Sequence, residues 1–291
     1  MKYPPLSPAG ASIAITGAAR GIGLATARAL HAAGAHIAIG DLDASLAQQA
    51  ANDIGPNATG HRLDVTDKDS FRSFLDRAEA AHGPLDVLVN NAGVMPNGPF
   101  LELDDATDRL TVDVNLIGVL NGMRLVLPGM IERGRGQITN VASLAGKFPI
   151  KGLAVYNATK YAVVGLTAAT RLEMRPHGIA VSAVLPSAVD TQLSSGLTMA
   201  PLPKVPPTAI AAAVLKTLTH RTAEIPVPGY VGALTTLSAL TPEPVLNTVR
   251  RLLRDDRALR PDHEARAAYT RRLTDDATEH GTRRTVPVGD E

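Results

Sequence analysis

Tyr156 and Lys160, four positions apart, have the types and spacing of an acid/base pair. On an α-helix, residues i and i+4 share a face, so this spacing places an ammonium group beside a phenol. An isolated tyrosine titrates near pH ~10, and a neighbouring positive charge stabilises the phenolate and lowers that pKa. We therefore expect Lys160 to tune Tyr156 for proton transfer near neutral pH. Taken alone, the same spacing is more often ordinary helix surface.

Further signals precede the pair. Ser143 follows an apolar segment at 136–142, Asn115 lies in Asp-Val-Asn-Leu-Ile-Gly at 113–118, and Asn-Asn-Ala-Gly occupies 90–93. A glycine-rich segment, Thr-Gly-Ala-Ala-Arg-Gly-Ile-Gly, occupies 16–23. In this order and at these separations, the motifs resemble the short-chain dehydrogenase/reductase family in its single-domain form, over about residues 12–191. Five motifs in order are far more specific than any one of them.

The resemblance implies hydride transfer between a nicotinamide cofactor and an alcohol or ketone. Such a reaction needs a tuned acid/base and a hydrogen-bond partner for the substrate oxygen. Tyr156 and Ser143 are expected in those two roles. Lys160 is expected both to lower the pKa of Tyr156 and to bind the nicotinamide ribose, and Asn115 to hold a water that relays the proton.

The glycine-rich segment lies where a strand is expected to turn into a helix. Without side chains there, the backbone can approach a pyrophosphate at the helix N-terminus. The spacing is the Gly-x-x-x-Gly-x-Gly of the short-chain family rather than Gly-x-Gly-x-x-Gly. The cofactor-binding residues expected from these motifs are Gly17, Arg20, Gly21, Ile22, Gly23, Asp41, Asp64, Val65, Asn91, Ala92, Gly93, Tyr156, Lys160, Val189 and Thr191.

Asp41, directly after the second expected strand, bears on the choice of cofactor. Its carboxylate would accept both hydroxyls of an adenine ribose and would repel the 2′-phosphate of NADP, which favours NAD. Arg20 argues the other way, because a guanidinium could meet a 2′-phosphate, although a pyrophosphate contact or a solvated arginine is at least as plausible. NAD is therefore expected and NADP is the alternative.

Four further residues lie in segments that resemble the family pattern. Asp64 and Val65 resemble the adenine contacts of the family, and Asp64 could also cap the helix expected from Asp67. Ser187 stands where the family usually has glycine, so the turn at Pro186 is expected to differ slightly. Asn90 is expected to brace the sheet.

The segments expected around the substrate are rich in apolar side chains, which predicts an apolar pocket. These residues are Val94, Met95, Pro96, Leu144, Phe148, Pro149, Leu153, Leu193, Leu197 and Met199. The expected substrate is a hydrophobic secondary alcohol or ketone, steroid-like or lipid-like. Lys147 or Lys151 could still meet a carboxylate.

The composition bounds the possible partners. A net charge of +1 over 291 residues creates no field for nucleic acid. The chain has no cysteine and no His-Glu-x-x-His motif, so we expect no metal. The N-terminus does not read as a signal peptide, and no uninterrupted apolar run reaches the ~18 residues of a membrane span. A cytoplasmic homodimer or homotetramer with a small hydrophobic substrate is expected, and association with a membrane surface is possible but not favoured.

Short apolar runs alternate with longer amphipathic stretches, which is the rhythm of a doubly wound α/β fold. Strands are expected at 12–15, 35–39, 60–63, 85–89, 137–141, 179–185 and 223–227. Helices are expected at 21–33, 44–54, 67–81, 107–133, 155–175 and 208–220, the last capped by Thr208. By resemblance the parallel sheet has the Rossmann order 3-2-1-4-5-6-7.

We expect two regions. Residues 8–228 form the Rossmann domain, including an irregular substrate loop near 190–207, and residues 229–291 form a helical extension. Within the extension, helices are expected at 234–240, 244–253 and 263–273, followed by a polar and disordered tail at 274–291. The extension could cover the pocket or the core, form a subunit contact, or attach to a membrane surface.

A second function from another class is a non-catalytic NAD-sensing Rossmann protein whose C-terminal extension binds a partner. Such a sensor has no need of a proton relay. The presence of Asn115, Ser143, Tyr156 and Lys160 together therefore favours an enzyme.

Overall fold

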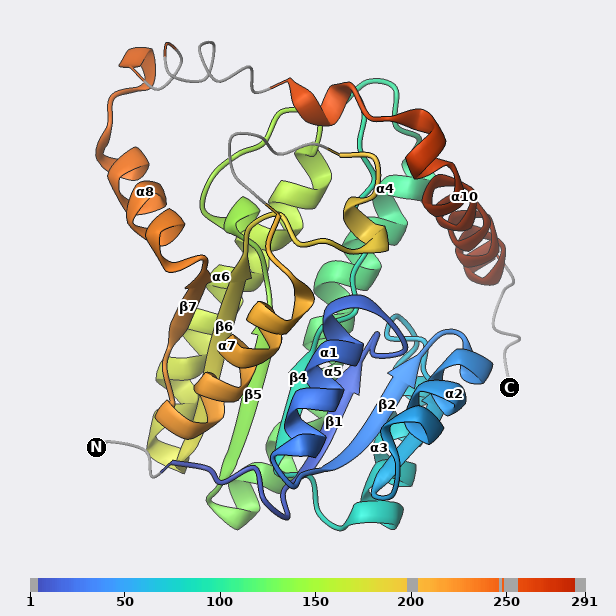
Figure 1. The fold of residues 1–291 in the computed structure, drawn as a ribbon, viewed down its shortest axis with the longest axis vertical. Helices are drawn as coiled ribbons and strands as arrows, with labels where there is room; N and C mark the ends of the chain where they lie inside the picture. The colour runs from blue at the N-terminus through green and yellow to red at the C-terminus, as the bar shows by residue number, and fades with distance from the viewer. Residues whose placement is uncertain (1–4, 198–203, 246–247, 249–255, 286–291) are drawn as a thin grey trace.

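In a computed structural model, residues 5–197, 204–245, 248 and 256–285 are described (Figure 1). Seven parallel strands form one sheet in the order β3-β2-β1-β4-β5-β6-β7, which confirms the predicted topology. The strands are β1 Ser12–Thr16, β2 His36–Asp41, β3 Ala58–Arg62, β4 Val87–Asn90, β5 Gly136–Val141, β6 Ile179–Pro186 and β7 Glu224–Val227. The central strands are buried throughout because helices cover both faces of the sheet.

Helices α1, α2 and α7 pack on one face, and helices α3, α5 and α6 pack on the other (Figure 1). The first set comprises Gly21–Ala32, Ala44–Ile54 and Pro207–His220, and the second comprises Lys68–His82, Gly118–Arg133 and Ala154–Met174. On the first face Ile13, Ile37 and Leu30 are completely buried. On the second, Phe71 fills the space between α3 and the sheet. Two continuous cores therefore hold the sheet.

Two helix starts differ from expectation. Asp67, not Asp64, caps α3, because its carboxylate accepts from the N–H groups of Asp69 and Ser70. Helix α7 begins at Pro207, so the predicted cap Thr208 lies inside its first turn. Proline is well suited to the first helical position, where its missing N–H leaves no hydrogen bond unmade.

The helix predicted at 107–133 is interrupted. It consists of α4 (Asp105–Val112), a π-helical turn η1 (Asp113–Ile117) and α5. By length and composition, Asp105–Arg133 would suffice to cross a membrane. However, α5 packs on the sheet at Gly122, where a Cβ would lie 2.6 Å from Asn90 Oδ1 and 2.7 Å from the Phe71 ring. This run is therefore a core helix of the domain, and its π-helical turn sits at the predicted site residue Asn115.

The C-terminal extension differs most from the prediction. Helix α8 spans Gly229–Leu240, and the helix predicted at 244–253 falls largely outside the described residues. Helix α10 runs from His263 to Thr285, so the expectation of disorder from 274 onward is wrong for 274–285. Tyr269, Leu273 and Ala277, spaced by four, form one buried face of α10 and pack against Leu110 of α4. This apolar stripe stabilises a helix whose overall composition is polar.

Arg266 ties α10 to the rest of the domain. It is 3% exposed, and its guanidinium donates to the carbonyl oxygens of Leu193 at 3.1 Å, Ser195 at 2.9 Å and Met95 at 2.7 Å. One buried cation thus joins the extension to two separate loops. Figure 1 shows α10 lying beside α4, at the end of the sheet where the strands terminate.

Replacing Arg266 should destabilise the protein. Arg266→Ala leaves three buried carbonyls without their donors, and we expect the free energy of unfolding, measured by urea titration, to fall by about 3 kcal/mol. Arg271→Ala changes an exposed arginine of the same helix and should alter the free energy of unfolding by less than ~0.5 kcal/mol. Equal unfolding midpoints for Arg266→Ala and wild type, with equal resistance to proteolysis, would show that Arg266 does not hold the extension.

Candidate active site

A large cavity lies at the carboxyl ends of the strands. It has a volume of about 1260 Å³ and is lined by the residues that follow β1, β2, β4, β5 and β6, together with residues of α6 and α10. A single small-molecule site usually measures ~300–1,000 Å³, so this cavity has room for a cofactor and a substrate together. Its position at the carboxyl ends of the strands, where the order reverses between β1 and β4, is the expected place for a ligand in this fold.

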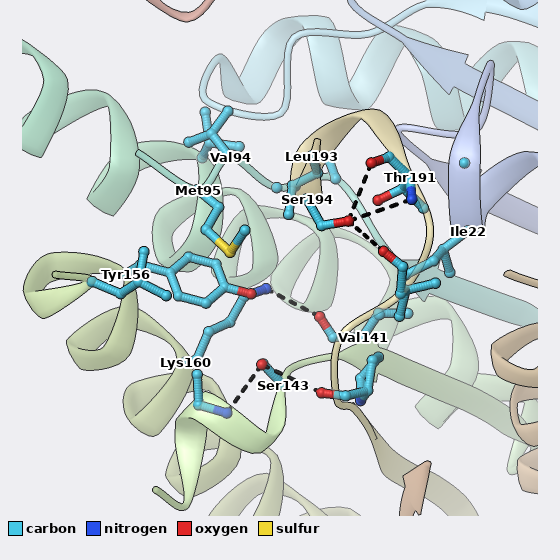
Figure 2. A pocket seen from close by; sticks show the side chains of 18 of the residues that line it. Ile22, Val94, Met95, Val141, Ser143, Tyr156, Lys160, Thr191, Leu193 and Ser194 are labelled. Atoms are coloured by element: carbon cyan, nitrogen blue, oxygen red, sulfur yellow. Dashed lines mark hydrogen bonds between the residues drawn. The ribbon is translucent and has the colours of Figure 1, made fainter. Parts of the chain in front are cut away.

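Ser143, Tyr156 and Lys160 meet in this cavity. Ser143 follows β5, whereas the other two lie one turn apart on α6 (Figure 2). The Lys160 Nζ is 5.6 Å from the centre of the Tyr156 ring and donates to the Val141 carbonyl at 3.2 Å. The Ser143 Oγ accepts from the Ala145 N–H at 3.0 Å, which fixes the serine hydroxyl. The predicted trio is therefore brought together by the end of one strand and one helix.

Burial controls the ionisation of this trio. Desolvation raises the pKa of Tyr156 to about 12, opposed by a hydrogen bond with Ser143 that lowers it and reinforced weakly by Tyr269. Desolvation likewise lowers the pKa of Lys160 to about 8. In the protein without ligands, burial therefore outweighs the hydrogen bond in setting the Tyr156 pKa, and the tuning of Tyr156 by Lys160 stays a prediction. Removing the phenolate from water costs more than its hydrogen bond with Ser143 returns.

Asn115 is fully buried in the π-helical turn. Its Oδ1 accepts from the Val94 N–H at 2.9 Å, and its Nδ2 donates to the Val94 carbonyl at 2.9 Å and to Thr159 Oγ1 at 3.2 Å. The side chain thus joins the loop after β4 to α6, one residue before Lys160. Its amide is occupied by these bonds, so here the side chain acts as a positioning group; the water relay stays a prediction.

The glycine-rich turn packs closely against the neighbouring segments of the cavity wall. Gly17 has φ +61°, and a Cβ there would lie 2.8 Å from Ala92 Cα. Gly21 has φ +55°, and a Cβ on it would lie 3.4 Å from Thr191 Cγ2. A Cβ on Gly23 would lie 2.6 Å from Asn91 Nδ2. Gly17, Gly21 and Ile22 line the cavity where α1 begins, and the free backbone N–H groups of a helix N-terminus suit a dinucleotide pyrophosphate.

The segment after β4 supports this turn. Asn91 Nδ2 donates to the carbonyls of Thr16 and Gly17, both at 2.9 Å. The Asn91 side chain thus anchors the glycine-rich turn, and the passage of the backbone of residues 91–93 close to an adenosine ribose stays a prediction. A Cβ on Gly93 would lie 3.2 Å from Asn115 Oδ1 and 3.7 Å from Lys160 Nζ, so a side chain here would press closely on Asn115. As predicted, Asn90 braces the sheet, by donating to Asn140 Oδ1 at 2.9 Å.

Asp41 and Arg20 lie side by side at one end of the cavity. The Asp41 carboxylate accepts from the Ala19 N–H at 3.1 Å and lies 3.7 Å from Arg20 Nη2. Asp64 accepts from the N–H and hydroxyl of Thr66, and the Val65 carbonyl accepts from Asn121. All four predicted residues line the cavity.

The residues after β6 complete the wall. Val189, Thr191 and Ile22 line the cavity. Ser187 does not occupy the left-handed region of φ, so the serine fits without backbone strain at the position where glycine was expected. Its buried Oγ has no hydrogen-bond partner among the described residues. That hydroxyl is a polar group available at the cavity.

Most of the predicted substrate-side residues line the cavity. They are Val94, Met95, Leu144, Phe148, Pro149, Leu153, Leu193 and Leu197. Met95, Leu153 and Leu197 pack together with the Tyr156 ring, and Met95 lies beside the ring in Figure 2. Pro96 does not line the cavity and Met199 lies outside the described residues. Lys147 pairs with Glu224 at 3.0 Å, and neither it nor Lys151 lines the cavity.

Several cavity residues come from the C-terminal extension and were not predicted from the sequence. Val231 of α8 and Tyr269, Arg272 and Asp276 of α10 line the cavity. The one signal in the sequence was the spacing of four between Tyr269, Leu273 and Ala277, which indicates a buried helix face but not what that face covers.

This fold and site define a Rossmann-type oxidoreductase, and comparison with known proteins agrees. Residues 11–200 match the family model for short chain dehydrogenases. A cis-4-hydroxycyclohexanecarboxylate dehydrogenase from Sinomonas cyclohexanicum is 42% identical over 63% of this chain and 75% of its own length. A 3-alpha-(or 20-beta)-hydroxysteroid dehydrogenase from Mycobacterium bovis is 38% identical over 62% of this chain and 69% of its own.

A solved structure gives the same result. The 3-ketoacyl-(acyl-carrier-protein) reductase from Brucella melitensis, crystallised with NADH, aligns with a TM-score of 0.71 at 29% identity, covering 76% of this chain and 98% of the reductase. The chain belongs to the short-chain dehydrogenase family. The matched region ends at residue 200, so α8 and α10 lie beyond it.

Burial of Lys160 should cost stability. Because its pKa is lower in the folded protein than the ordinary 10.5, the folded state binds fewer protons and stability rises with pH between about 8 and 10.5. At pH 7 the cost is about 3 kcal/mol, since one pKa unit corresponds to ~1.4 kcal/mol. We therefore expect Lys160→Met to be more stable than wild type without ligands at pH 7, and this advantage to shrink by pH 10. Urea unfolding at both pH values tests it; a pH-independent difference would contradict it.

Proposed function

We propose that this protein is an NAD-dependent dehydrogenase or ketone reductase that acts on a hydrophobic secondary alcohol or ketone. The observation that carries the proposal is the placement of Tyr156 and Ser143 in an apolar, water-poor part of a cavity large enough for two ligands. The nicotinamide cofactor, when bound, would supply or accept the hydride. The residues of the chain would bind and orient the cofactor and the substrate, and would transfer the proton.

Ser143 and Tyr156 would both contact the substrate oxygen. The serine hydroxyl is held by the Ala145 N–H and would keep that oxygen next to the phenol. In reduction the Tyr156 hydroxyl donates its proton to the developing alkoxide, and in oxidation the phenolate takes the proton of the alcohol. Without ligands, burial favours the neutral phenol, which is the form needed for reduction. Lys160, close to the ring, would stabilise the phenolate when it forms.

The ion pair of Asp41 and Arg20 supports NAD over NADP. The carboxylate is held by the Ala19 N–H at the end of β2, where an adenine ribose would lie. Arg20, the group that could attract a 2′-phosphate, is already 3.7 Å from that carboxylate. A phosphate entering this corner would meet the carboxylate directly, with a repulsion of roughly 4 kcal/mol per charge at an effective dielectric of 20.

The apolar wall supports a hydrophobic substrate. Met95, Leu153 and Leu197 pack around the catalytic ring, and the nearby Lys147 is engaged by Glu224. The relatives named above act, by their names, on a cyclohexane derivative and on steroids, which are alicyclic compounds. We therefore propose an alicyclic or similarly bulky secondary alcohol. The joint presence of an acid/base and its partners argues against a sensor that only binds NAD.

We also propose a homodimer or homotetramer in the cytoplasm. Tyr161 and Leu172 on α6 and Ile131 on α5 are exposed apolar side chains on the two long helices. Their burial against a second copy would remove apolar surface from water.

Tyr156→Phe should abolish turnover without affecting the binding of NADH. It removes the proton donor and little else, and general acid catalysis contributes a factor of roughly 10²–10⁴. We expect kcat to fall by at least a factor of about 100 and the NADH dissociation constant to stay within about twofold. Tyr161→Phe removes the same hydroxyl from an exposed position of α6 and serves as the control. Retention of more than about a tenth of the wild-type kcat, a loss below ~1.4 kcal/mol in barrier, would make the assigned mechanism wrong.

Asp41→Ala should relax the cofactor preference, because it removes the repelling carboxylate and frees Arg20. We expect the ratio of kcat/KM for NADPH over NADH to rise at least about tenfold. Asp43→Asn removes a nearby charge but still leaves a good capping residue at the start of α2. This control should leave the ratio of kcat/KM for NADPH over NADH unchanged. A wild-type preference for NADPH would overturn the choice of NAD.

A further inference from the structure

Helix α10 forms a wall of the cavity rather than a separate appendage. The Met95 N–H donates to the Tyr269 hydroxyl oxygen at 2.7 Å, and Arg266 binds the carbonyls of Met95 and Leu193. One turn of α10 is therefore bound both to the loop after β4 and to the loop after β6. Leu273 and Ala277 continue this contact along α4. Four buried side chains thus hold α10 in place beside the cavity. They are Arg266, Tyr269, Leu273 and Ala277.

Arg272 lies at the rim of this face. Its Nη1 donates to Gln192 Oε1 at 3.1 Å, and its guanidinium carbon is 5.7 Å from the centre of the Tyr269 ring. Gln192 directly follows Thr191, whose Cγ2 lies 3.4 Å from the position of a Cβ on Gly21. The guanidinium is therefore bonded to the residue next to Thr191, and Arg272, Thr191 and Gly21 line the same cavity.

The other cations that line the cavity, within the part of the chain that the structure describes, have different positions. Arg20 lies against Asp41, and Lys160 donates to the Val141 carbonyl. Arg257 precedes Ala258, which packs with the substrate-side residues. Asp276, one turn along α10, interacts electrostatically with Arg272 and, less strongly, with Arg20, and all three residues line the cavity.

We propose that Arg272 binds the diphosphate of the dinucleotide cofactor and so makes the C-terminal extension part of the cofactor site. This inference rests on the proposed use of a nicotinamide dinucleotide. The α1 N-terminus offers backbone N–H groups from one side, and Arg272 offers a planar, permanently charged group from the other. A guanidinium can donate to a phosphate oxygen and to Gln192 at the same time, because its five N–H groups point in fixed directions.

The test compares ligands that differ in the diphosphate. Dissociation constants of NADH, ADP-ribose and adenosine are measured by calorimetry for wild type and Arg272→Gln. We expect about three- to tenfold weaker binding of NADH and ADP-ribose, and an unchanged constant for adenosine. The wild-type affinity for ADP-ribose should fall with added salt more steeply than that of the variant, since one screened charge is removed. Arg272→Lys keeps the charge but not the fork, and should bind with intermediate affinity.

Arg271→Gln is the matched control, because it removes an exposed arginine from the adjacent position of α10. Thermal unfolding checks that both variants are folded. Equal ADP-ribose affinity in wild type and Arg272→Gln, or an equal loss in Arg271→Gln, would overturn the role of Arg272. If wild type bound neither NADH nor ADP-ribose, the proposed cofactor itself would be wrong, so the two failures are distinguishable.

Discussion

The buried ammonium of Lys160 beside the Tyr156 ring is the interaction on which the rest of the site depends. Burial disfavours charge on both groups, since it raises the pKa of the phenol and lowers that of the amine. A lysine in this position lowers the stability of the empty protein, and a functional role accounts for its presence. A charged group that a bound ligand or substrate can stabilise is most effective where water does not compete.

The surrounding structure holds this pair in place. The end of β5 offers the Val141 carbonyl to Lys160, and the π-helical turn brings Asn115 against Thr159 on α6. Gly93 lies next to this pair, since a Cβ on it would be 3.7 Å from the Lys160 Nζ. On the opposite side, α10 fixes the loops at Met95 and Leu193 through Arg266. The extension thus has a structural connection to the catalytic pocket, although it lies beyond the region shared with the family.

Much of the fold and most of the site could be predicted from the sequence. The strands are short apolar runs and the helices are amphipathic, so the strand order followed once the family was identified. Ser143, Tyr156, Lys160 and the glycines are fixed by local spacing, which a sequence displays directly. By contrast, the pKa values of Tyr156 and Lys160 depend on burial by residues far apart in the chain, and spacing alone does not show that burial raises the pKa of Tyr156.

The extension was harder to predict for a related reason. Its residues 274–285 are polar, and the face that orders them is narrow, with Leu273 and Ala277 buried against Leu110. Composition therefore suggested disorder where tertiary contact provides the stability. In the same way, the functional position of Asn115 was predicted, but its bonds to the Val94 backbone follow from a π-helical turn that leaves no clear mark in the sequence.

Titration of Lys160 by NMR tests the central claim most directly. With ¹³C-labelled lysine, the Cε resonance of Lys160 is assigned by its loss in a variant that lacks this side chain, and it is followed with pH in the protein without ligands. A midpoint near 8 is predicted from its burial, with the exposed lysines titrating near their ordinary value of about 10.5. A midpoint near 10.5 for Lys160 would contradict the account, because it would show that the ammonium is solvated and that the pair does not share a water-excluded pocket.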